Sequence, residues 1–532
     1  MPAERLSDAA LRDLPLEDRV LAPIFRQRIE QDADRPFLRF GSEHYTYGQF
    51  AERTLAFARG LARLGIGKGS IVPILLPNCA QYVMAWFAVQ LRGAAMALLN
   101  PALKGRLLEN ALVDCDPRVV IAGGDALAQV AALTRERCKH LGTIIAVGPG
   151  SGVSDSRLVS FETIGEKGGA DPIADASFDD VQAIFFTSGS TGPAKGVLMP
   201  NAHFFGNPCS FMRLSGLSRE DVLHTSLPLF HGVGSRQGVL PAFMIGAQAC
   251  LGAKFSASRF WQTVSEEQAT IALLTPSMPP ILAALAPGRF DRGHRLRAIY
   301  NVPHDAAFEE RFGVRMLTSF AITEIGVVIY TPYPERRLGA MGVAHEDWEL
   351  AIVDEMDRPL GDDRQGQLVC RPKKPYLMMQ GYLNRPEAAA AAWRNLWYHT
   401  GDFMRRDADG YFYFTGRDKD RIRRRGENIS PLEIESELRH HPAIADCVAV
   451  PFPARDGEDD IRAIVVAREA MALPAFAELY GWLAARLPPN MMPRYFEIAP
   501  ALPMTATDKV DRRALRDAPL GDGFWDREAQ PS

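Results

Sequence analysis

Cysteine is scarce in this sequence and follows no recognised spacing. Only seven of the 532 residues are cysteine, and they form neither a Cys-x-x-Cys pair nor a Cys/His cluster with the spacing of metal ligands. An odd, scattered set argues against a disulfide framework, and the missing ligand spacing argues against a structural zinc site. The sequence therefore predicts a fold held by its own core in a reducing compartment.

A large excess of one charge and a long uninterrupted apolar run are also missing. Lys and Arg number 60 against 64 Asp and Glu, and a net charge of -4 is not that of a general nucleic-acid binder. The longest apolar stretch, residues 82–99, contains Gln90, Arg92 and Gly93, which indicates a buried helix and a strand rather than a membrane span. The N-terminus lacks the apolar core of a secretory signal. We expect a cytoplasmic protein with no integral membrane segment and no nucleic-acid partner.

Apolar residues alternate between helical and strand spacing along most of the chain. Helical spacing is found at residues 47–64, 80–92 and 260–267, and short apolar runs typical of strands are found at 71–76, 94–99, 119–122, 143–147, 183–186, 221–227, 247–251 and 271–274. Alternating strands and helices predict an α/β fold, with a large N-terminal domain of parallel sheets covered by helices.

The character of the sequence changes twice towards the C-terminus. After Gly339, short strands such as 350–353 and 366–371 are separated by turn residues, which predicts a small β-barrel-like subdomain at about 339–416. Near residue 416 a charged stretch begins, followed by an amphipathic helix at 431–439 and a compact tail. We therefore predict two domains, residues 1–416 and a small α+β domain at 417–532.

The segment TSGSTGPAKG, Thr187 to Gly196, carries the strongest chemical signal and follows a predicted strand. Glycines let backbone N–H groups approach phosphate oxygens, hydroxyl groups donate hydrogen bonds, and Lys195 supplies positive charge. No GK[ST] pair ends the segment, so it is not a Walker loop. An ordinary polar turn is the alternative, but the density of hydroxyls favours a polyphosphate site. The predicted contacts are Thr187, Ser188, Gly189, Ser190, Thr191, Gly192 and Lys195.

This segment resembles the phosphate loop of the adenylate-forming superfamily, which contains acyl-CoA synthetases, adenylation domains of peptide synthetases and firefly luciferase. Four further signatures follow in the expected order: TSFAITE (318–324), WYHTGD (397–402), GRDKDRIRRRGENISPLEIE (416–435) and LPMTATDKVDR (502–512). The resemblance implies an AMP-forming ligase that joins a small carboxylic acid to coenzyme A through an acyl-adenylate. It also implies ATP, Mg²⁺ and coenzyme A as cofactors.

The same resemblance assigns nucleotide and metal roles to particular residues. The resemblance makes Glu324 a Mg²⁺ ligand, which is chemically sensible because a carboxylate after an apolar run is costly without a cation; a surface glutamate is the alternative. Asp402, expected in a turn after a glycine, corresponds to the acceptor for the ribose hydroxyls, and a turn-forming aspartate is the alternative. Phe320 replaces the adenine-stacking tyrosine and keeps the stacking face, and Thr323 joins the nucleotide contacts. Arg417 has a ribose or phosphate role, with a solvated charge as the alternative.

The resemblance also gives two lysines a role in the two half-reactions. Lys509 corresponds to the catalytic lysine that stabilises the charge built up when a carboxylate attacks the α-phosphorus of ATP. The small C-terminal domain of the resembling family is mobile and pivots at a residue that corresponds to Lys419. After the rotation, Gly426 lines the pantetheine tunnel; a turn glycine is the alternative. Arginines 423–425 either meet the 3′-phosphate of coenzyme A or are solvated.

The identity of the acid stays open. His231, in LPLFHGVG, matches a position that borders the acyl and nucleotide sites, and a core histidine is the alternative. Ala321 and Asp508 replace the glycines usual in their motifs. The chain looks most like the crotonobetaine/carnitine-CoA ligase group, for whose quaternary ammonium an aromatic cage would be needed. Candidates for that cage, each of which could equally be a core residue, are Phe204, Phe205, Phe230 and Trp261.

Two rival functions and the oligomeric state also stay open. A stand-alone adenylation enzyme could load a carrier protein supplied in trans instead of coenzyme A. A non-catalytic relic could retain the nucleotide alone, but Lys509, Glu324 and the phosphate loop are all present, which argues against it. A homodimer is possible, and the sequence does not fix the oligomeric state.

Overall fold

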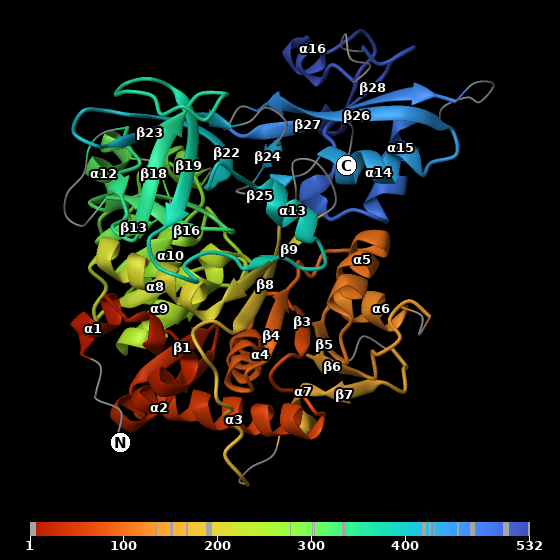
Figure 1. Ribbon diagram of the computed structural model, residues 1–532. Coiled ribbons are helices and arrows are strands. Elements are labelled where there is room, and N and C mark those ends of the chain that lie inside the picture. Colours follow the sequence, from red (N-terminus) through yellow and green to blue (C-terminus); the bar gives the residue numbers. More distant parts are fainter. Residues whose placement is uncertain are drawn as a thin grey trace. The chain divides into compact units, whose positions relative to one another are not determined.

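A computed structural model of the chain is shown in Figure 1. It describes residues 7–133, 136–148, 153–165, 169–187, 194–276, 278–300, 302, 304–331, 337, 339–417, 422–424, 427–429, 431–454, 457–468, 474–503 and 510–529. Contacts between Cα atoms divide the chain into two compact units. The larger unit comprises Met1–Pro101, Leu112–Phe185 and Gly196–Gly416, and the smaller one comprises Ala102–Ala111, Phe186–Lys195 and Arg417–Ser532.

An eight-stranded, mainly parallel sheet carries the segment that precedes the predicted phosphate loop. Its strands in spatial order are β20 (Gly381–Tyr382), β9 (Lys195–Pro200), β8 (Val181–Thr187), β4 (Ala95–Leu98), β3 (Ile71–Leu75), β5 (Val119–Gly123), β6 (Thr143–Val147) and β7 (Leu158–Ser160). Strand β8 runs parallel to β4, with Phe185 opposite Leu98, while β20 pairs antiparallel with β9. The parallel sheet expected from the alternating pattern is confirmed.

A seven-stranded sheet forms the second layer of the larger unit. Its order is β14 (Arg315–Leu317), β13 (Ala298–Tyr300), β12 (Ile271–Leu273), β10 (Val222–Thr225), β11 (Gln248–Leu251), β1 (Pro36–Phe40) and β2 (Glu43–Thr46). All neighbouring pairs are parallel except the β1–β2 hairpin. The parallel strands are buried along most of their length, which explains why they read as continuous apolar runs in the sequence.

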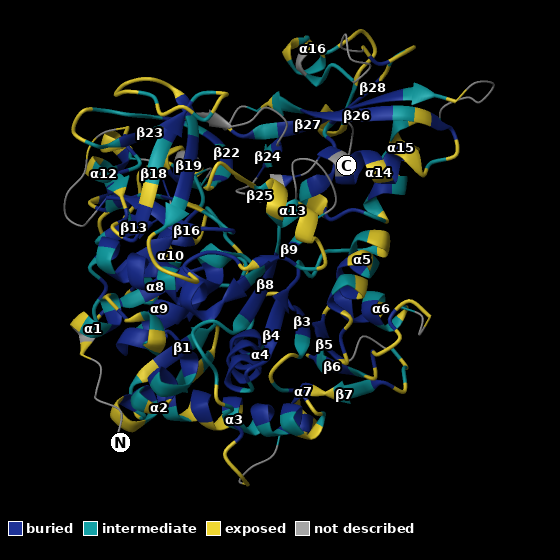
Figure 2. Cartoon of the chain, in the orientation of Figure 1, coloured by how far each residue is buried: buried dark blue, intermediate teal, exposed yellow. Residues whose placement is uncertain are grey.

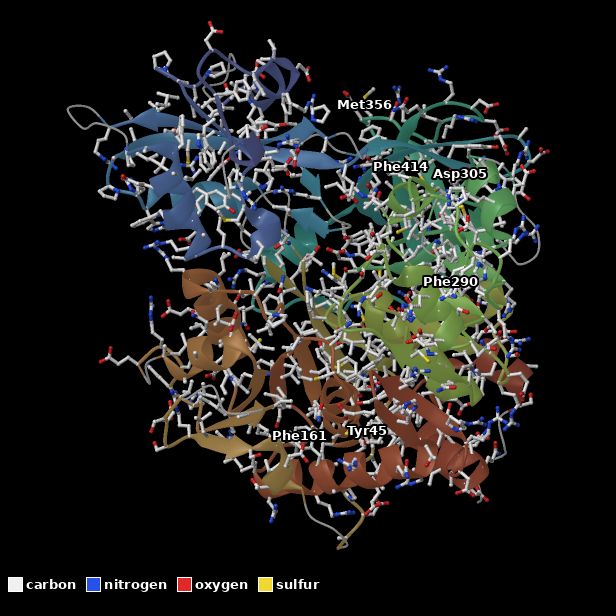
Figure 3. The ribbon with its side chains drawn as sticks, turned by 180° about the vertical axis from the view of Figure 1, so that it is seen from behind. Tyr45, Phe161, Phe290, Asp305, Met356 and Phe414 are labelled. Atoms are coloured by element: carbon white, nitrogen blue, oxygen red, sulfur yellow. The ribbon has the colours of Figure 1, made fainter. Side chains whose placement is uncertain are left out.

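Helices cover these sheets as the sequence predicted. The helix expected at 47–64 is confirmed as α3, whose N-cap residue Thr46 exchanges hydrogen bonds with Gln49 in a capping box. Figure 2 shows α4 buried almost throughout, in keeping with its uniform apolarity. Phe161 of α7, labelled in Figure 3, stacks on Phe57 with 4.3 Å between the ring centroids.

The helices of the larger unit are α1 (Asp8–Arg12), α2 (Leu21–Asp32), α3 (Tyr47–Arg63), α4 (Ala80–Leu91), α6 (Asp125–Ala131), α7 (Phe161–Ile164), α8 (Asn201–Ser215), α9 (Leu240–Ile245), α10 (Phe260–Glu266), α11 (Met278–Ala283), α12 (Ala306–Phe312) and α13 (Pro386–Ala391). Helix α5 (Gly105–Cys115) spans the division between the units. Among the described residues, no helix combines the length and the apolarity needed to cross a bilayer.

Antiparallel strands replace the parallel pattern after residue 318. Strands β15 (Ser319–Ile322), β16 (Gly326–Tyr330) and β17 (Val343–Ala344) form one sheet, and β18 (Trp348–Val353), β19 (Gly366–Pro372), β22 (Trp397–Arg406), β21 (Trp393–Arg394) and β23 (Phe412–Arg417) form another. Phe320, Trp348 and Tyr398 share one hydrophobic cluster between them. Met356 and Phe414, labelled in Figure 3, are exposed on this part. The predicted β-rich part is confirmed, while its predicted limits, about 339–416, stay a prediction.

The smaller unit is an α+β assembly with its own core. A four-stranded sheet contains β26 (Ile444–Pro453), β27 (Asp459–Ala467), β28 (Tyr495–Ile498) and β29 (Trp525–Asp526), and β24 (Ile422–Arg424) pairs with β25 (Glu427–Ile429). Its helices include α14 (Pro431–Arg439), α15 (Phe476–Ala484) and α16 (Arg512–Asp517). Buried residues such as Ile434, Leu479 and Phe496 join these elements in one cluster. The α+β character predicted for this segment is confirmed.

Candidate active site

The two ends of the predicted phosphate loop lie at the ends of neighbouring strands. Thr187 is the last residue of β8 and Lys195 is the first of β9, and the Thr187 hydroxyl donates a hydrogen bond of 3.5 Å to the carbonyl oxygen of Lys195. A short connection between two central strands places its backbone at the carboxyl edge of a parallel sheet, where α/β folds bind ligands. The predicted contacts Ser188, Gly189, Ser190, Thr191 and Gly192 lie outside the described residues.

Glu324 is a buried carboxylate held by a tyrosine from the same sheet. Its side chain is 9% exposed, and its Oε1 accepts a hydrogen bond of 3.0 Å from the hydroxyl of Tyr382. Tyr382 belongs to β20 and lies opposite Val197 of β9, two residues after Lys195 in the sequence. The backbone also contributes, because the N–H of Met379 donates to the carbonyl of Glu324 at 2.8 Å. The predicted metal ligand is thus anchored beside the strand that follows the phosphate loop.

A second tyrosine connects Glu324 to the WYHTGD motif. Tyr398 of β22 is buried in the cluster that contains Tyr382 and Phe320. Burial, followed by the negative charge of Glu324 and a hydrogen bond with Tyr382, raises the pKa of Tyr398 well above its usual value. Tyr398 therefore stays a neutral hydroxyl group. Sequence reasoning missed both tyrosines, since only the fold brings β20 and β22 next to residue 324.

The remaining residues of the TSFAITE motif differ in exposure. Phe320 is 5% exposed and packs among the apolar side chains of its cluster, whereas Ala321 is exposed. Antiparallel pairing of β15 with β16 produces this alternation. The carbonyl of Thr323 accepts a hydrogen bond of 2.9 Å from Nε2 of His203 on α8. Stacking of adenine on Phe320 stays a prediction.

Asp402 lies in a strand and not in the turn that the sequence predicted. It belongs to β22, where the register with β19 shifts between Gln367 and Val369. Gly401 has a φ of 74°, which a β-bulge accommodates only with a residue that tolerates the left-handed region. The bulge turns Asp402 into the interior, where it is 1% exposed and its N–H donates to the Thr400 hydroxyl at 3.1 Å. Its predicted contact with ribose stays a prediction.

His231 begins a tight helical turn that the sequence did not predict. Residues Val233–Gln237 form a π-helical turn, and both the N–H and the hydroxyl of Ser235 donate to the carbonyl of His231. The His231 ring is half-buried, with its centroid 4.5 Å from that of Phe230. π-helical turns are rare and are found mostly at functional sites. The turn sets the path of the chain directly after the predicted active-site histidine.

The candidate residues for an aromatic cage lie in two separate hydrophobic clusters. Phe204 and Phe205 are fully buried in the main hydrophobic core, and Trp261 lies in a separate cluster with Phe260 and Phe312. For these residues the core alternative is correct. Their ring faces already pack against other core side chains, so they are not available to surround a quaternary ammonium group.

The C-terminal predictions fall partly outside the described residues. Lys509, Asp508, Lys419 and Gly426 lie outside them, as does the side chain of Arg417, whose backbone ends β23. The described ends of the segment around Lys509 are joined, since the N–H of Asp511 donates to the carbonyl of Pro503 at 2.7 Å.

Arg424 is neither solvated nor a free phosphate contact. Its side chain is buried, forms an ion pair of 3.3 Å with Asp460 and donates to the carbonyl of Met492. The alternation of a two-stranded ribbon directs it inward, so the solvated alternative is wrong for this residue, and the phosphate contact stays a prediction. Arg425 lies outside the described residues.

Glu433 is a further buried carboxylate that sequence reasoning missed. It lies on α14 and is 4% exposed. It accepts a hydrogen bond from the backbone N–H of Ala194, which comes directly before Lys195 and belongs to the same compact unit as α14. Burial raises the pKa of Glu433 to about 7. The amphipathic pattern of α14 gave no sign that an acidic residue would face inward.

Comparison with known families accounts for both parts of the chain. The family described as AMP-binding enzyme matches residues 25–383, and the AMP-binding enzyme C-terminal domain matches residues 433–509. The chain belongs to the AMP-binding enzyme family. The first match covers well over half of the chain and includes the phosphate loop segment and Glu324.

Relatives of this AMP-binding enzyme include several acid:CoA ligases. The crotonobetaine/carnitine–CoA ligase of Salmonella paratyphi B is 30% identical over 485 residues, which cover 89% of this chain and 93% of that protein. The malonyl-CoA ligase product complex with methylmalonyl-CoA and AMP has a TM-score of 0.73 at 28% identity, covering 88% of this chain and 97% of the other. The o-succinylbenzoate CoA synthetase of Bacillus subtilis has a TM-score of 0.79 at 23% identity over 94% and 98% of the chains, which shows the shared fold.

Proposed function

We propose that this AMP-binding enzyme is an ATP-dependent carboxylic acid:CoA ligase that forms AMP. The acid attacks the α-phosphorus of ATP and pyrophosphate leaves; the thiol of coenzyme A then attacks the acyl carbon and AMP leaves. The observation that carries the proposal is the match of both family segments along one chain whose relative over 89% of its length is a CoA ligase. The buried Glu324, anchored by Tyr382 beside β9, supports it independently.

The residues around Glu324 suit a divalent cation. A buried carboxylate is costly unless a cation or strong donors compensate it, and the described side-chain partner of Glu324 is the hydroxyl of Tyr382. Carboxylate oxygens are the ligands that Mg²⁺ prefers, usually through one or two carboxylates together with substrate phosphates. We therefore assign Glu324 to Mg²⁺, which would neutralise charge on the phosphates when bound.

The other roles belong to the same proposal. Phosphate contacts come from residues 187–192 and Lys195, ribose and adenine contacts from Asp402, Arg417, Phe320 and Thr323, and positioning of the acid from His231. Lys509 acts in adenylation, Lys419 is the pivot and Gly426 lines the pantetheine path. The two compact units support domain limits at 1–416 and 417–532. A homodimer and a cytoplasmic location complete the proposal, and chromatography and fractionation test them.

The relatives leave the acid itself unspecified. The crotonobetaine/carnitine–CoA ligase relatives favour a betaine-type acid, while the malonyl-CoA ligase favours a dicarboxylic acid. A quaternary ammonium needs an aromatic cage. Because Phe204, Phe205 and Trp261 serve as core, these side chains do not provide one.

Pyrophosphate exchange and thioester formation test the proposed function. With ATP, Mg²⁺ and a broad acid panel, the enzyme should exchange pyrophosphate without coenzyme A and yield a thioester detectable by mass spectrometry with it. Exchange without any thioester would favour loading of a carrier protein. The absence of both exchange and AMP release for every acid would instead favour a non-catalytic nucleotide-binding protein.

Lys509→Ala separates the two half-reactions. Adenylation should slow by a factor on the order of 10² to 10³, because an ammonium ion at the reacting centre is lost. Thioester formation from a supplied acyl-adenylate should continue at the wild-type rate. Lys254→Ala, at an exposed position, is the matched control and should change neither step. Equal loss in both half-reactions would refute the role of Lys509.

A further inference from the structure

Arg236 is a fully enclosed cation without a carboxylate partner among the described residues. It lies on the π-helical turn Val233–Gln237 and is 3% exposed. Within the part of the chain that the structure describes, its Nε has no hydrogen-bond partner, and its Nη1 donates to the sulfur of Met199, a weak acceptor, at 3.3 Å. Burial lowers the pKa of Arg236 to about 9, and the other contributor is the hydroxyl of Tyr300 rather than an acid. A guanidinium in this position is strongly under-compensated.

The surroundings of this guanidinium are apolar and aromatic. Its centre lies 5.3 Å from the ring centroid of Phe185 and 5.9 Å from that of Phe204, so cation–π contacts supply part of the missing stabilisation. On another side the guanidinium packs closely against the backbone of Gly232, because a Cβ built there would lie only 3.0 Å from Nη2 of Arg236. An apolar lining with one placed charge is typical of a small-molecule site.

Two of the predicted site segments lie next to Arg236, and His203 links it to a third. Phe185 precedes Thr187 by two residues, and Gly232 directly follows His231. Burial, followed by the positive charge of Arg236, lowers the pKa of His203 to about 3, and Nε2 of His203 contacts the carbonyl of Thr323. The guanidinium therefore lies between strand β8, the turn after His231 and helix α8, and His203 of α8 contacts the TSFAITE motif.

We propose that Arg236 binds a second carboxylate at the far end of the acid, so that the preferred substrates are dicarboxylic acids. This inference rests on the proposed function. The reacting carboxylate must meet the α-phosphorus of ATP, whereas Arg236 is enclosed against the main core by Phe204, so a group that reaches it belongs to the opposite end of the acyl chain. A bound carboxylate would supply the paired, bidentate acceptor that the guanidinium lacks. The same charge disfavours acids that carry a quaternary ammonium.

Matched pairs of acids test this directly. We would measure AMP release with butyrate and succinate, hexanoate and adipate, and octanoate and suberate, using the wild type and Arg236→Met. The wild type should prefer the diacid of at least one pair. The variant should lose that preference through a fall in kcat/KM for the diacid of about a hundredfold, with the monoacid unchanged or improved. Arg236→Lys, which keeps the charge but loses the planar fork, should fall in between.

Stability measurements distinguish a loss of substrate preference from a loss of folding. Arg236→Met should unfold at the same temperature as the wild type or higher, because an apolar side chain replaces an uncompensated charge. The control Arg19→Met removes another buried arginine, one whose guanidinium donates to the carbonyls of Leu14 and Ala202. It should lower stability without changing the ratio of diacid to monoacid rates.

Specific outcomes would overturn the inference. An equal fall for both acids of every pair would place Arg236 at the reacting carboxylate, and a change confined to the KM for ATP would place it at the nucleotide. Calorimetry with the diacid alone separates this inference from the proposed function: if no acid releases AMP, the ligase proposal fails, yet diacid binding lost in Arg236→Met still supports the site. If the wild type shows no preference for diacids over monoacids in this binding measurement, the inference about Arg236 is refuted.

Discussion

Replacing Glu433 by glutamine should stabilise the smaller unit at neutral and alkaline pH. Glu433 is 4% exposed on α14, one of its carboxylate oxygens has no hydrogen-bond partner among the described residues, and the Ala194 N–H compensates the carboxylate only in part. Glutamine keeps the shape and the acceptor oxygen while it removes the charge. The perturbation therefore isolates the cost of ionising a buried carboxyl group.

The magnitude follows from the pKa. Burial raises the pKa of Glu433 from its ordinary value of 4.5 to about 7. The folded state thus binds the proton more tightly than the unfolded state. Its contribution to stability is complete below pH 4.5, decreases as the pH rises towards 7 and is lost above that. At about 1.4 kcal/mol per pH unit, Glu433→Gln should gain about 3 kcal/mol over the wild type at pH 8 and nothing near pH 4.5.

Urea unfolding at pH 5, 6, 7 and 8 measures this difference. Hydrogen-exchange mass spectrometry on peptides from β26 and β27 reports on the smaller unit alone. The matched control is Glu497→Gln, because Glu497 is also buried in this unit but contacts Arg462 at 2.7 and 2.8 Å. Loss of that pair should cost about 3 kcal/mol at pH 8. Destabilisation by Glu433→Gln at pH 8, or a difference that does not change with pH, would refute the reasoning.

Two further substitutions test the larger unit. Tyr382→Phe removes the hydrogen bond to Glu324, which should cost about 1 kcal/mol and raise the Mg²⁺ concentration needed for half-maximal AMP release several-fold; an unchanged Mg²⁺ dependence would contradict the metal assignment. Gly234→Ala should destabilise the π-helical turn by about 1–3 kcal/mol, since the new Cβ would lie 2.2 Å from the Pro228 carbonyl oxygen. The control Gly481→Ala, with nothing within 4 Å of the new Cβ, should keep or raise the melting temperature.

Local patterns in the sequence determined the elements and the family. The helix at 47–64 and the strands around residues 183–186 and 366–371 could be predicted because each carries its own periodicity, cap or breaker. The motifs that contain Lys195, Glu324 and Lys509 are contiguous, so their chemistry can be recognised without a fold. The family and the ligase reaction follow from these segments.

Long-range packing decided what surrounds those motifs. Tyr382 and Tyr398 belong to strands that lie far from Glu324 in the sequence. They come close to Glu324 only because β20 pairs with β9 and because β22 packs in the same hydrophobic cluster. A bulge in β22 moved Asp402 from the expected turn into a buried strand position. Neither position leaves a local trace in the sequence.

The sequence by itself therefore determined which reaction the chain supports, since the motifs are short continuous segments whose residue types indicate their chemistry without the fold. Only the tertiary structure decided how charges are compensated. Arg236 and Glu433 look like ordinary polar residues in the sequence, and their burial depends on elements that approach from elsewhere in the chain. Solvation is a property of the whole surrounding volume, so it cannot be read from neighbours along the chain.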